Sequence, residues 1–136
     1  MQAQTQPPLR IYLEAGLTMV VASVAVRLFG LRSIRGRKVA SRQSPATPRQ
    51  IYEISRATRA WARRLPWRTL CFEQGLTAHW MLRRRALAST LYYGAAKTRG
   101  QLKAHVWVKS DAQDVIGCES AAEYALLATF PPEAAA

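Results

Sequence analysis

The chain has 136 residues, of which 49% are hydrophobic and 21% charged, a composition typical of one globular domain and not of a disordered chain. Its formal net charge of +12 predicts an acidic partner, either a protein or peptide, nucleic acid or an anionic membrane surface. Two cysteines are too few for a disulfide framework, and no Cys/His spacing suggests zinc, so we expect no metal. The polar N-terminus does not resemble a secretory signal, and a reduced, cytoplasmic location is expected.

The first predicted element is a helix over residues 9–31. Large aliphatic residues form one stripe along it: Leu9, Leu13, Leu17, Val20, Val24 and Leu28. The opposite side is apolar too, so we expect the middle of this helix to be covered on all sides. Its uncharged run, 15–26, has only twelve residues, whereas a membrane-spanning helix needs about 20. Packing on the rest of the domain is therefore the first expectation, and a peripheral membrane contact is the second.

A basic segment follows, because no acidic residue lies between Glu14 and Glu53. It leads into the Ser/Pro-rich sequence "SRQSPATP", which is typical of a linker. We therefore predict an N-terminal helix and basic linker in residues 1–45 and the main domain in 46–136. No aromatic residue is interleaved from 30 to 50, so this charge run is weak support for nucleic-acid binding, and none is predicted.

A second helix is predicted from Thr47 onwards. Thr47 suits the N-cap, Pro48 suits the first turn, and Gln50 completes the spacing of a capping box. Pro66 ends the helix.

A third helix is predicted from about Cys71 to Arg85, with Thr69 near its N-cap. Its apolar residues are too many for a helix with one buried side, so we expect it to be central and buried.

After this helix the apolar period changes from helical to two. Strands are predicted over residues 86–94, 102–109 and 114–119, followed by a short helical or irregular segment, "SAAEYALLATF". Helices followed by an antiparallel sheet predict the α+β class, with a central Cys-bearing helix packed on a small sheet.

Cys71 is the residue with the clearest chemical potential. It stands at a helix start, where unpaired N–H groups and the helix dipole favour an anion, and Arg64 and Arg68 precede it. Both features favour the thiolate, which is the nucleophilic form. The alternative is a buried structural cysteine.

His105 is a candidate partner for this thiol. It lies on the strand face opposite Val106 and Val108. A helix start that abuts the strand of a following hairpin can bring a thiol to an imidazole, the minimum for cysteine catalysis. His79 and Cys118 have no such partner and are expected to be structural.

The order of motifs around these two residues resembles a known family. "RTLCFEQGLTAHWMLRRRALASTLYYGA" and then "LKAHVWVKSDAQDVIG" are similar to the leader peptidases of lasso peptide biosynthesis, which belong to the transglutaminase-like, papain-related cysteine proteases. The end, "DVIGCE…ALLATFPP", is similar to the proteobacterial branch. The resemblance covers residues 50 to 132, and the 34 positions from Cys71 to His105 make it more specific than either motif alone.

The resemblance implies a transglutaminase-like fold and a Cys-His-Asp endopeptidase, without a cofactor, that removes the leader from a lasso peptide precursor. It also implies an ATP-dependent, macrolactam-forming cyclase as a partner. The first forty residues are too short for a fused leader-binding domain, so a separate small leader-binding protein is expected. The basic excess would then dock an acidic leader or that protein.

By this resemblance Cys71 is the nucleophile, His105 the base and Asp114 the acid, with Glu119 and Asp111 as alternatives. A hairpin centred on 111–112 sets Lys109 opposite Asp114 and His105 nearer residues 117–119, which weighs against Asp114.

The backbone N–H of Cys71 is expected to form the oxyanion hole, with Gln74 or Trp67 as a second donor. The competing functions are a non-catalytic module that binds an acidic peptide or partner, acyl transfer to an amine, and nucleic-acid binding.

Overall fold

The α-helices of this chain come before its strands. The computed structural model describes residues 6–30, 43–66 and 71–130. The helices are α1 (Leu9–Phe29), α2 (Pro48–Arg64) and α3 (Cys71–Arg84). The strands are β1 (Thr90–Thr98), β2 (Gln101–Ser110), β3 (Gln113–Ile116) and β4 (Ala125–Phe130), with a short 3-10 helix, η2 (Cys118–Glu123), before β4. The predicted α+β class is confirmed.

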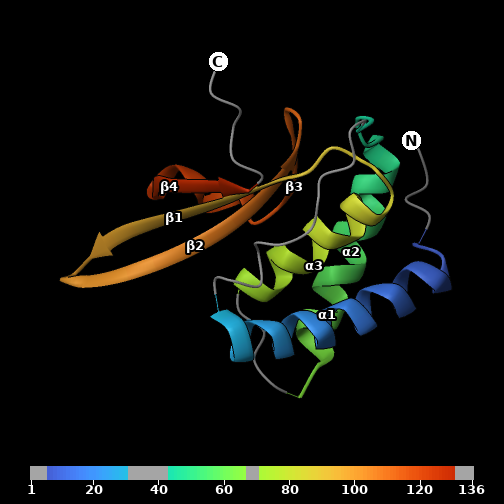
Figure 1. Ribbon diagram of the computed structural model, residues 1–136, viewed down its shortest axis with the longest axis horizontal. Coiled ribbons are helices and arrows are strands. Elements are labelled where there is room, and N and C mark those ends of the chain that lie inside the picture. Colours follow the sequence, from blue (N-terminus) through green and yellow to red (C-terminus); the bar gives the residue numbers. More distant parts are fainter. Residues whose placement is uncertain (1–5, 31–42, 67–70, 131–136) are drawn as a thin grey trace.

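The strands form one antiparallel sheet in the order β3-β2-β1-β4. β1 and β2 are joined by Arg99 and Gly100, whose φ values of 53° and 79° match the two-residue turns that favour hairpins. The tip of this hairpin reaches away from the helices, as Figure 1 shows. His105 lies further back along β2, nearer the helices.

The last segment differs from the prediction. Residues 120–130 were predicted to be helical or irregular, but 125–130 form β4, which pairs with β1 from Leu91↔Phe130 to Ala95↔Ala125. The reason is long-range, because the second edge of β1 offers backbone hydrogen-bonding groups that a local pattern does not reveal. β1 also begins at Thr90, four residues later than predicted.

Local signals did define the helix boundaries. The Gln50 N–H donates to Thr47 Oγ1 at 3.2 Å, and the Thr47 N–H donates to Gln50 Oε1 at 2.9 Å, so the predicted capping box is confirmed. α2 ends at Arg64, just before Pro66, and α3 begins at Cys71. Thr69, the predicted cap of α3, lies outside the described residues.

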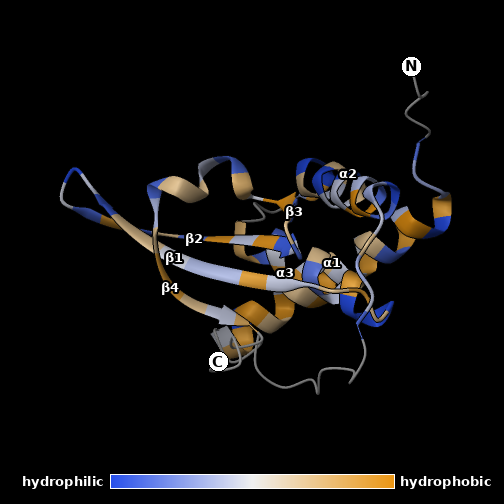
Figure 2. Ribbon diagram, turned by 90° about the horizontal axis from the view of Figure 1, so that it is seen from above, coloured by the Kyte–Doolittle hydropathy of each residue, from blue (hydrophilic) through white to orange (hydrophobic). Residues whose placement is uncertain are grey.

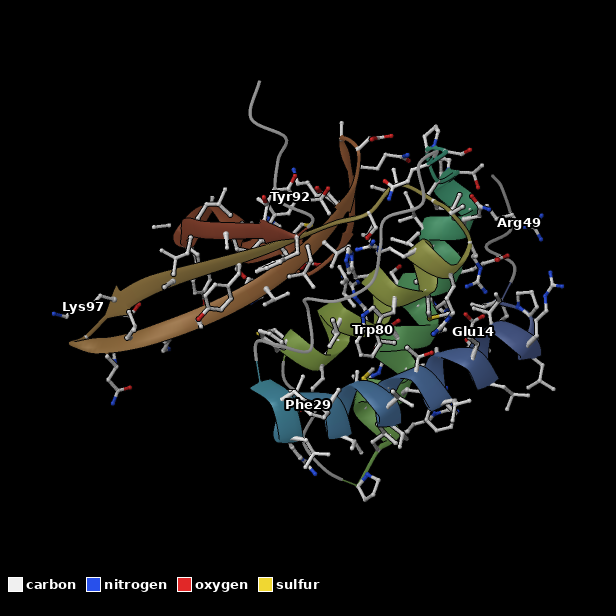
Figure 3. All side chains as sticks on the ribbon, in the orientation of Figure 1. Glu14, Phe29, Arg49, Trp80, Tyr92 and Lys97 are labelled. Carbon is white, nitrogen blue, oxygen red and sulfur yellow. The ribbon has the colours of Figure 1, made fainter. Side chains whose placement is uncertain are left out.

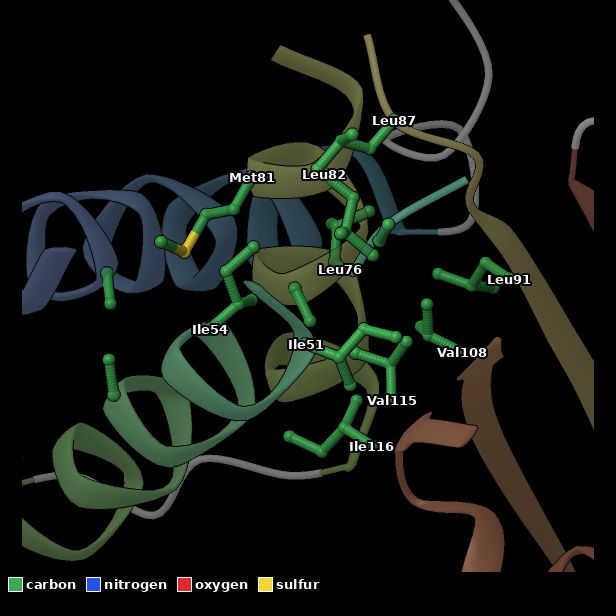
Figure 4. Close-up of a cluster of buried hydrophobic side chains, with 14 of the residues drawn as sticks. Ile51, Ile54, Leu76, Met81, Leu82, Leu87, Leu91, Val108, Val115 and Ile116 are labelled. Atoms are coloured by element: carbon green, nitrogen blue, oxygen red, sulfur yellow. The ribbon is translucent and has the colours of Figure 1, made fainter. Parts of the chain in front are cut away.

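α3 is the central element, as expected. α1 and α2 both pack against it, and β2 packs on its other side. The core between these elements consists of aliphatic side chains, shown in Figure 4: Ile51, Ile54, Leu76, Met81, Leu82, Leu91, Val108, Val115 and Ile116.

α1 packs on only one side, which corrects the expectation of cover all round. Its small side, with Ala15 and Ala22, is fully buried, whereas Leu17 of the aliphatic stripe is 69% exposed. Small residues face the core because they let the helices approach closely. A Cβ on Gly16 would lie 2.6 Å from Cε2 of Trp61 on α2. The Trp61 indole N–H also donates to the Tyr12 carbonyl at 2.6 Å.

An ion cluster fixes α1 to the end of α3. The Glu14 carboxylate accepts hydrogen bonds from Arg84, at 3.1 Å, and from Arg85. Figure 3 shows Glu14 on the side of α1 that faces α3. The hydrogen bond from Arg85 is the main reason why the pKa of Glu14 lies below its usual value.

Candidate active site

A cleft of about 420 Å³ opens where α2, the start of α3 and the β2–β3 region meet. The residues of chemical interest that line it are Arg59, Arg63, Cys71, Gln74, His105 and Glu119. The structure therefore brings Cys71 and His105 to the same cleft, although 34 positions separate them in the sequence.

Cys71 is the first residue of α3 and is half-buried. At the start of an α-helix the first N–H groups lack intrahelical partners, a setting that can stabilise an oxyanion formed at the thiol. One turn further on, Gly75 packs against β2: a Cβ there would lie 2.7 Å from Val106 Cγ1. This close approach holds the start of α3 beside the strand that carries His105.

A backbone carbonyl orients the His105 ring. His105 Nε2 lies 2.7 Å from the carbonyl oxygen of Gly117 and 3.4 Å from Ser120 Oγ. Because a carbonyl oxygen can only accept, Nε2 carries the hydrogen and the neutral ring keeps its lone pair on Nδ1. Nδ1 is therefore the nitrogen that can take a proton from a thiol.

Gly117 suits this role because of its backbone. Its φ of 76° is a left-handed conformation at the start of η2. A Cβ at this position would lie 2.8 Å from the Val106 carbonyl oxygen. Sequence reasoning placed His105 near residues 117–119 but missed the backbone of Gly117 as its partner.

Two aromatic rings stack against His105. The Tyr124 ring centroid is 4.9 Å from that of His105, with an interplanar angle of 27°, and the Trp107 centroid is 5.9 Å away at 21°. Trp107 stacks in turn on Tyr92, at 5.7 Å and 6°. Gly94, opposite His105 on β1, leaves room for Trp107, since a Cβ there would lie 2.9 Å from Trp107 Cη2. Sequence reasoning did not find Tyr124.

The structure brings none of the three candidate carboxylates into contact with His105. Asp114 lies opposite Lys109, as the predicted register required, and its Oδ1 is 3.4 Å from Lys109 Nζ. Asp111 lies in the turn between β2 and β3, with a φ of 52°. Glu119 does line the cleft, but its carboxylate pairs with Arg59 at 2.6 Å. An acid role for Asp114 stays a prediction that this geometry does not favour.

Of the two proposed oxyanion donors, Gln74 lines the cleft and Trp67 lies outside the described residues. Cys118 differs from Cys71: burial raises the pKa of its thiol, which donates to the Val108 carbonyl at 3.3 Å. His79 is buried against Ser89, with Nδ1 2.6 Å from Oγ, and burial lowers its pKa to about 3. Within residues 6–30, 43–66 and 71–130, no three Cys, His, Asp or Glu side chains cluster as metal ligands would.

The residues that build this cleft lie within a stretch that matches a family sequence model. The model of the transglutaminase-like superfamily matches residues 16–129. The chain belongs to the transglutaminase-like superfamily. Its helices followed by a small antiparallel sheet agree with a transglutaminase-like fold, and the superfamily includes cysteine proteases and acyltransferases. Neither the curated proteins nor the solved structures contain a match to this transglutaminase-like chain.

Proposed function

We propose that this transglutaminase-like protein is a cytoplasmic cysteine endopeptidase that removes the leader peptide from a lasso peptide precursor. A separate small leader-binding protein would present the precursor, and an ATP-dependent cyclase would use the product. The observation that carries the peptidase chemistry is that Cys71 and His105 line one cleft, with Nδ1 of His105 keeping its lone pair. The lasso specificity is supported by the "LCFEQGL…LRRR…STLYYGA…AHVWV" resemblance.

The geometry supports the following sequence of steps. His105 Nδ1 takes the proton of the Cys71 thiol as sulfur attacks the scissile carbonyl. The N–H groups at the start of α3 stabilise the oxyanion of the tetrahedral intermediate. The peptide C–N bond then breaks, and the amine leaves with the proton from His105. Water, activated by the same imidazole, hydrolyses the thioester and restores the thiol.

In this proposal the Gly117 carbonyl, not a side-chain acid, orients His105 and stabilises its protonated form. The 2.7 Å contact with Nε2 supplies the acceptor that an acid would otherwise provide. Asp114→Asn should therefore leave kcat/KM within a few-fold of wild type. A loss of about 10⁴-fold, the size known for removal of a triad aspartate, would instead restore Asp114 to the triad.

Variants of the two cysteines test the proposed catalysis. Cys71→Ala and His105→Ala should each abolish cleavage of the cognate precursor. Cleavage is measured by mass spectrometry of the precursor incubated with the enzyme and the leader-binding protein. Cys118→Ala is the matched control, because the chain has two cysteines and only Cys71 lines the cleft. Cleavage by Cys71→Ala at the normal rate would exclude the proposed nucleophile.

Alkylation separates catalysis from simple binding. Iodoacetamide at neutral pH should label Cys118→Ala protein at Cys71 faster than it labels Cys71→Ala protein at Cys118. An inert Cys71 would favour the alternative, a non-catalytic module whose Arg59 and Arg63 hold an acidic peptide in the cleft. A product joined to an added amine, rather than a free acid, would favour acyl transfer.

A further inference from the structure

The outer face of α1 is a continuous aliphatic surface. Between Arg10 and Arg27, the exposed residues of this helix are all leucine or valine: Leu13, Leu17, Val20, Val21 and Val24. Leu9 at one end and Leu28 and the aromatic Phe29 at the other extend the apolar surface, each more than 60% exposed. Figure 2 colours α1 largely as hydrophobic, and Figure 3 shows Phe29 at its C-terminal end. Exposed apolar patches larger than a few hundred Å² mark sites that bind proteins or membranes.

The chemistry of this face favours lipid over protein. Protein interfaces are enriched in aromatic residues and arginine and carry about one hydrogen bond per 100–200 Å². The five exposed side chains between Arg10 and Arg27 have no donor or acceptor at all. A bilayer interior requires neither, so a purely aliphatic surface matches it.

The charges at the two ends of this face favour an anionic membrane surface over a neutral one. Arg10 and Arg27 stand on α1 about 25 Å apart, from the rise of 1.5 Å per residue, and both are exposed. Arg10 has no ion-pair partner among the described residues. Glu14, the one acidic residue of α1, is already neutralised by Arg84 and Arg85. Cationic groups at both ends and no free carboxylate suit the phosphates of acidic lipids.

The packing of α1 defines how it would meet the bilayer. By length and composition alone, the helix could cross a membrane, a test that core helices and signal sequences also pass. Its inner side, with Ala15, Met19 and Ala22 fully buried, is part of the core, and a crossing would remove it. A membrane contact that keeps this core intact would therefore place the helix in the plane of the membrane surface.

We propose that α1 is an interfacial helix that docks this domain on an anionic membrane through its outer aliphatic face. In Figure 1, α1 forms one edge of the molecule and the sheet lies on the other side of α3. No residue of α1 lines the cleft that holds Cys71 and His105, so docking through α1 leaves that cleft open. The inference does not depend on the catalytic proposal.

Vesicle sedimentation of the full chain tests this proposal. Wild-type protein should sediment with vesicles of phosphatidylcholine and phosphatidylglycerol and much less with phosphatidylcholine alone. Leu17→Asp should weaken binding at least about tenfold, the factor expected when one leucine is no longer buried in the membrane. Leu102→Asp is the matched control, because Leu102 is 78% exposed at the hairpin tip, and it should bind as wild type does.

A second pair of variants isolates the charge. Arg10→Glu should weaken binding to the anionic vesicles, whereas Arg99→Glu at the hairpin tip should not. Equal binding to both kinds of vesicle, or equal loss with Leu102→Asp, would overturn the proposal. The proposal would also be overturned if wild-type protein did not bind vesicles but formed a dimer that Leu17→Asp disrupts. In that case α1 would be an interface between two copies of the chain. Unchanged thermal unfolding of the variants confirms that they are folded.

Discussion

The contact between Gly75 and Val106 predicts that a single added methyl group will disturb both stability and catalysis. A Cβ at residue 75 would lie 2.7 Å from Val106 Cγ1, about 1 Å closer than an ordinary carbon–carbon contact. Overpacking of this kind costs about 1–3 kcal/mol, while replacing glycine by alanine within a helix contributes about 1 kcal/mol in the other direction. The net effect of Gly75→Ala on the free energy of unfolding is therefore small or moderate, and the coupling to Val106 is the sharper quantity.

A double-mutant cycle measures this coupling. Val106→Ala removes the methyl group that Gly75→Ala would meet, so the double variant should be more stable than the sum of the single effects by about 0.5–3 kcal/mol in urea unfolding. Val108→Ala is the matched control, because Val108 is equally buried but its Cγ2 lies 3.7 Å from the same position.

In the catalytic assay, Gly75→Ala should lower kcat/KM by up to about 10²-fold, since it pushes the start of α3 away from β2. The double variant should recover part of that loss. Additivity of Gly75→Ala and Val106→Ala within about 0.5 kcal/mol would refute the close approach on which this reasoning rests.

Three further predictions follow from single residues. The pKa of His79 is about 3 in the folded protein and 6.5 in the unfolded chain, so the stability that neutral His79 contributes is complete above pH 6.5 and is lost as pH falls towards 3. In urea unfolding at several pH values, the free energy of unfolding of His79→Gln should therefore depend less on pH than that of wild type. Gly117→Ala should reduce kcat/KM more than tenfold, because the strained φ moves the carbonyl that holds His105. Thr47→Ala should cost about 1 kcal/mol in urea unfolding and leave catalysis unchanged, since it removes only a helix cap.

The fold could be predicted where short-range chemistry determines it. The capping box at Thr47, the proline after α2 and the alternating pattern of β2 are local, and each element lies where these signals placed it. β4 could not be predicted in this way, because its partner β1 lies about 35 residues earlier in the chain. The exposed side of α1 was missed for a related reason: both sides of that helix are apolar, and only close packing at Gly16 decides which one is inside.

The site was predictable to the extent that it consists of side chains. A thiol at a helix start and an imidazole on a following strand are visible in the sequence, and the hairpin register placed His105 near residues 117–119. The partner of the imidazole is a backbone carbonyl. Every residue has one, so the residue types in the sequence do not indicate which carbonyl binds His105. Only the left-handed conformation of Gly117, φ 76°, distinguishes that carbonyl, and a single glycine letter does not reveal its conformation.

This dependence on backbone changes which substitutions should matter at the site. None of the three candidate acids, Asp111, Asp114 and Glu119, contacts His105. Asp114 is paired with Lys109 instead, and Glu119 with Arg59. If the 117 carbonyl orients His105, changes to these acids should act weakly and through local packing. Changes that alter the path of residues 117–120 should act strongly, because they move the acceptor itself.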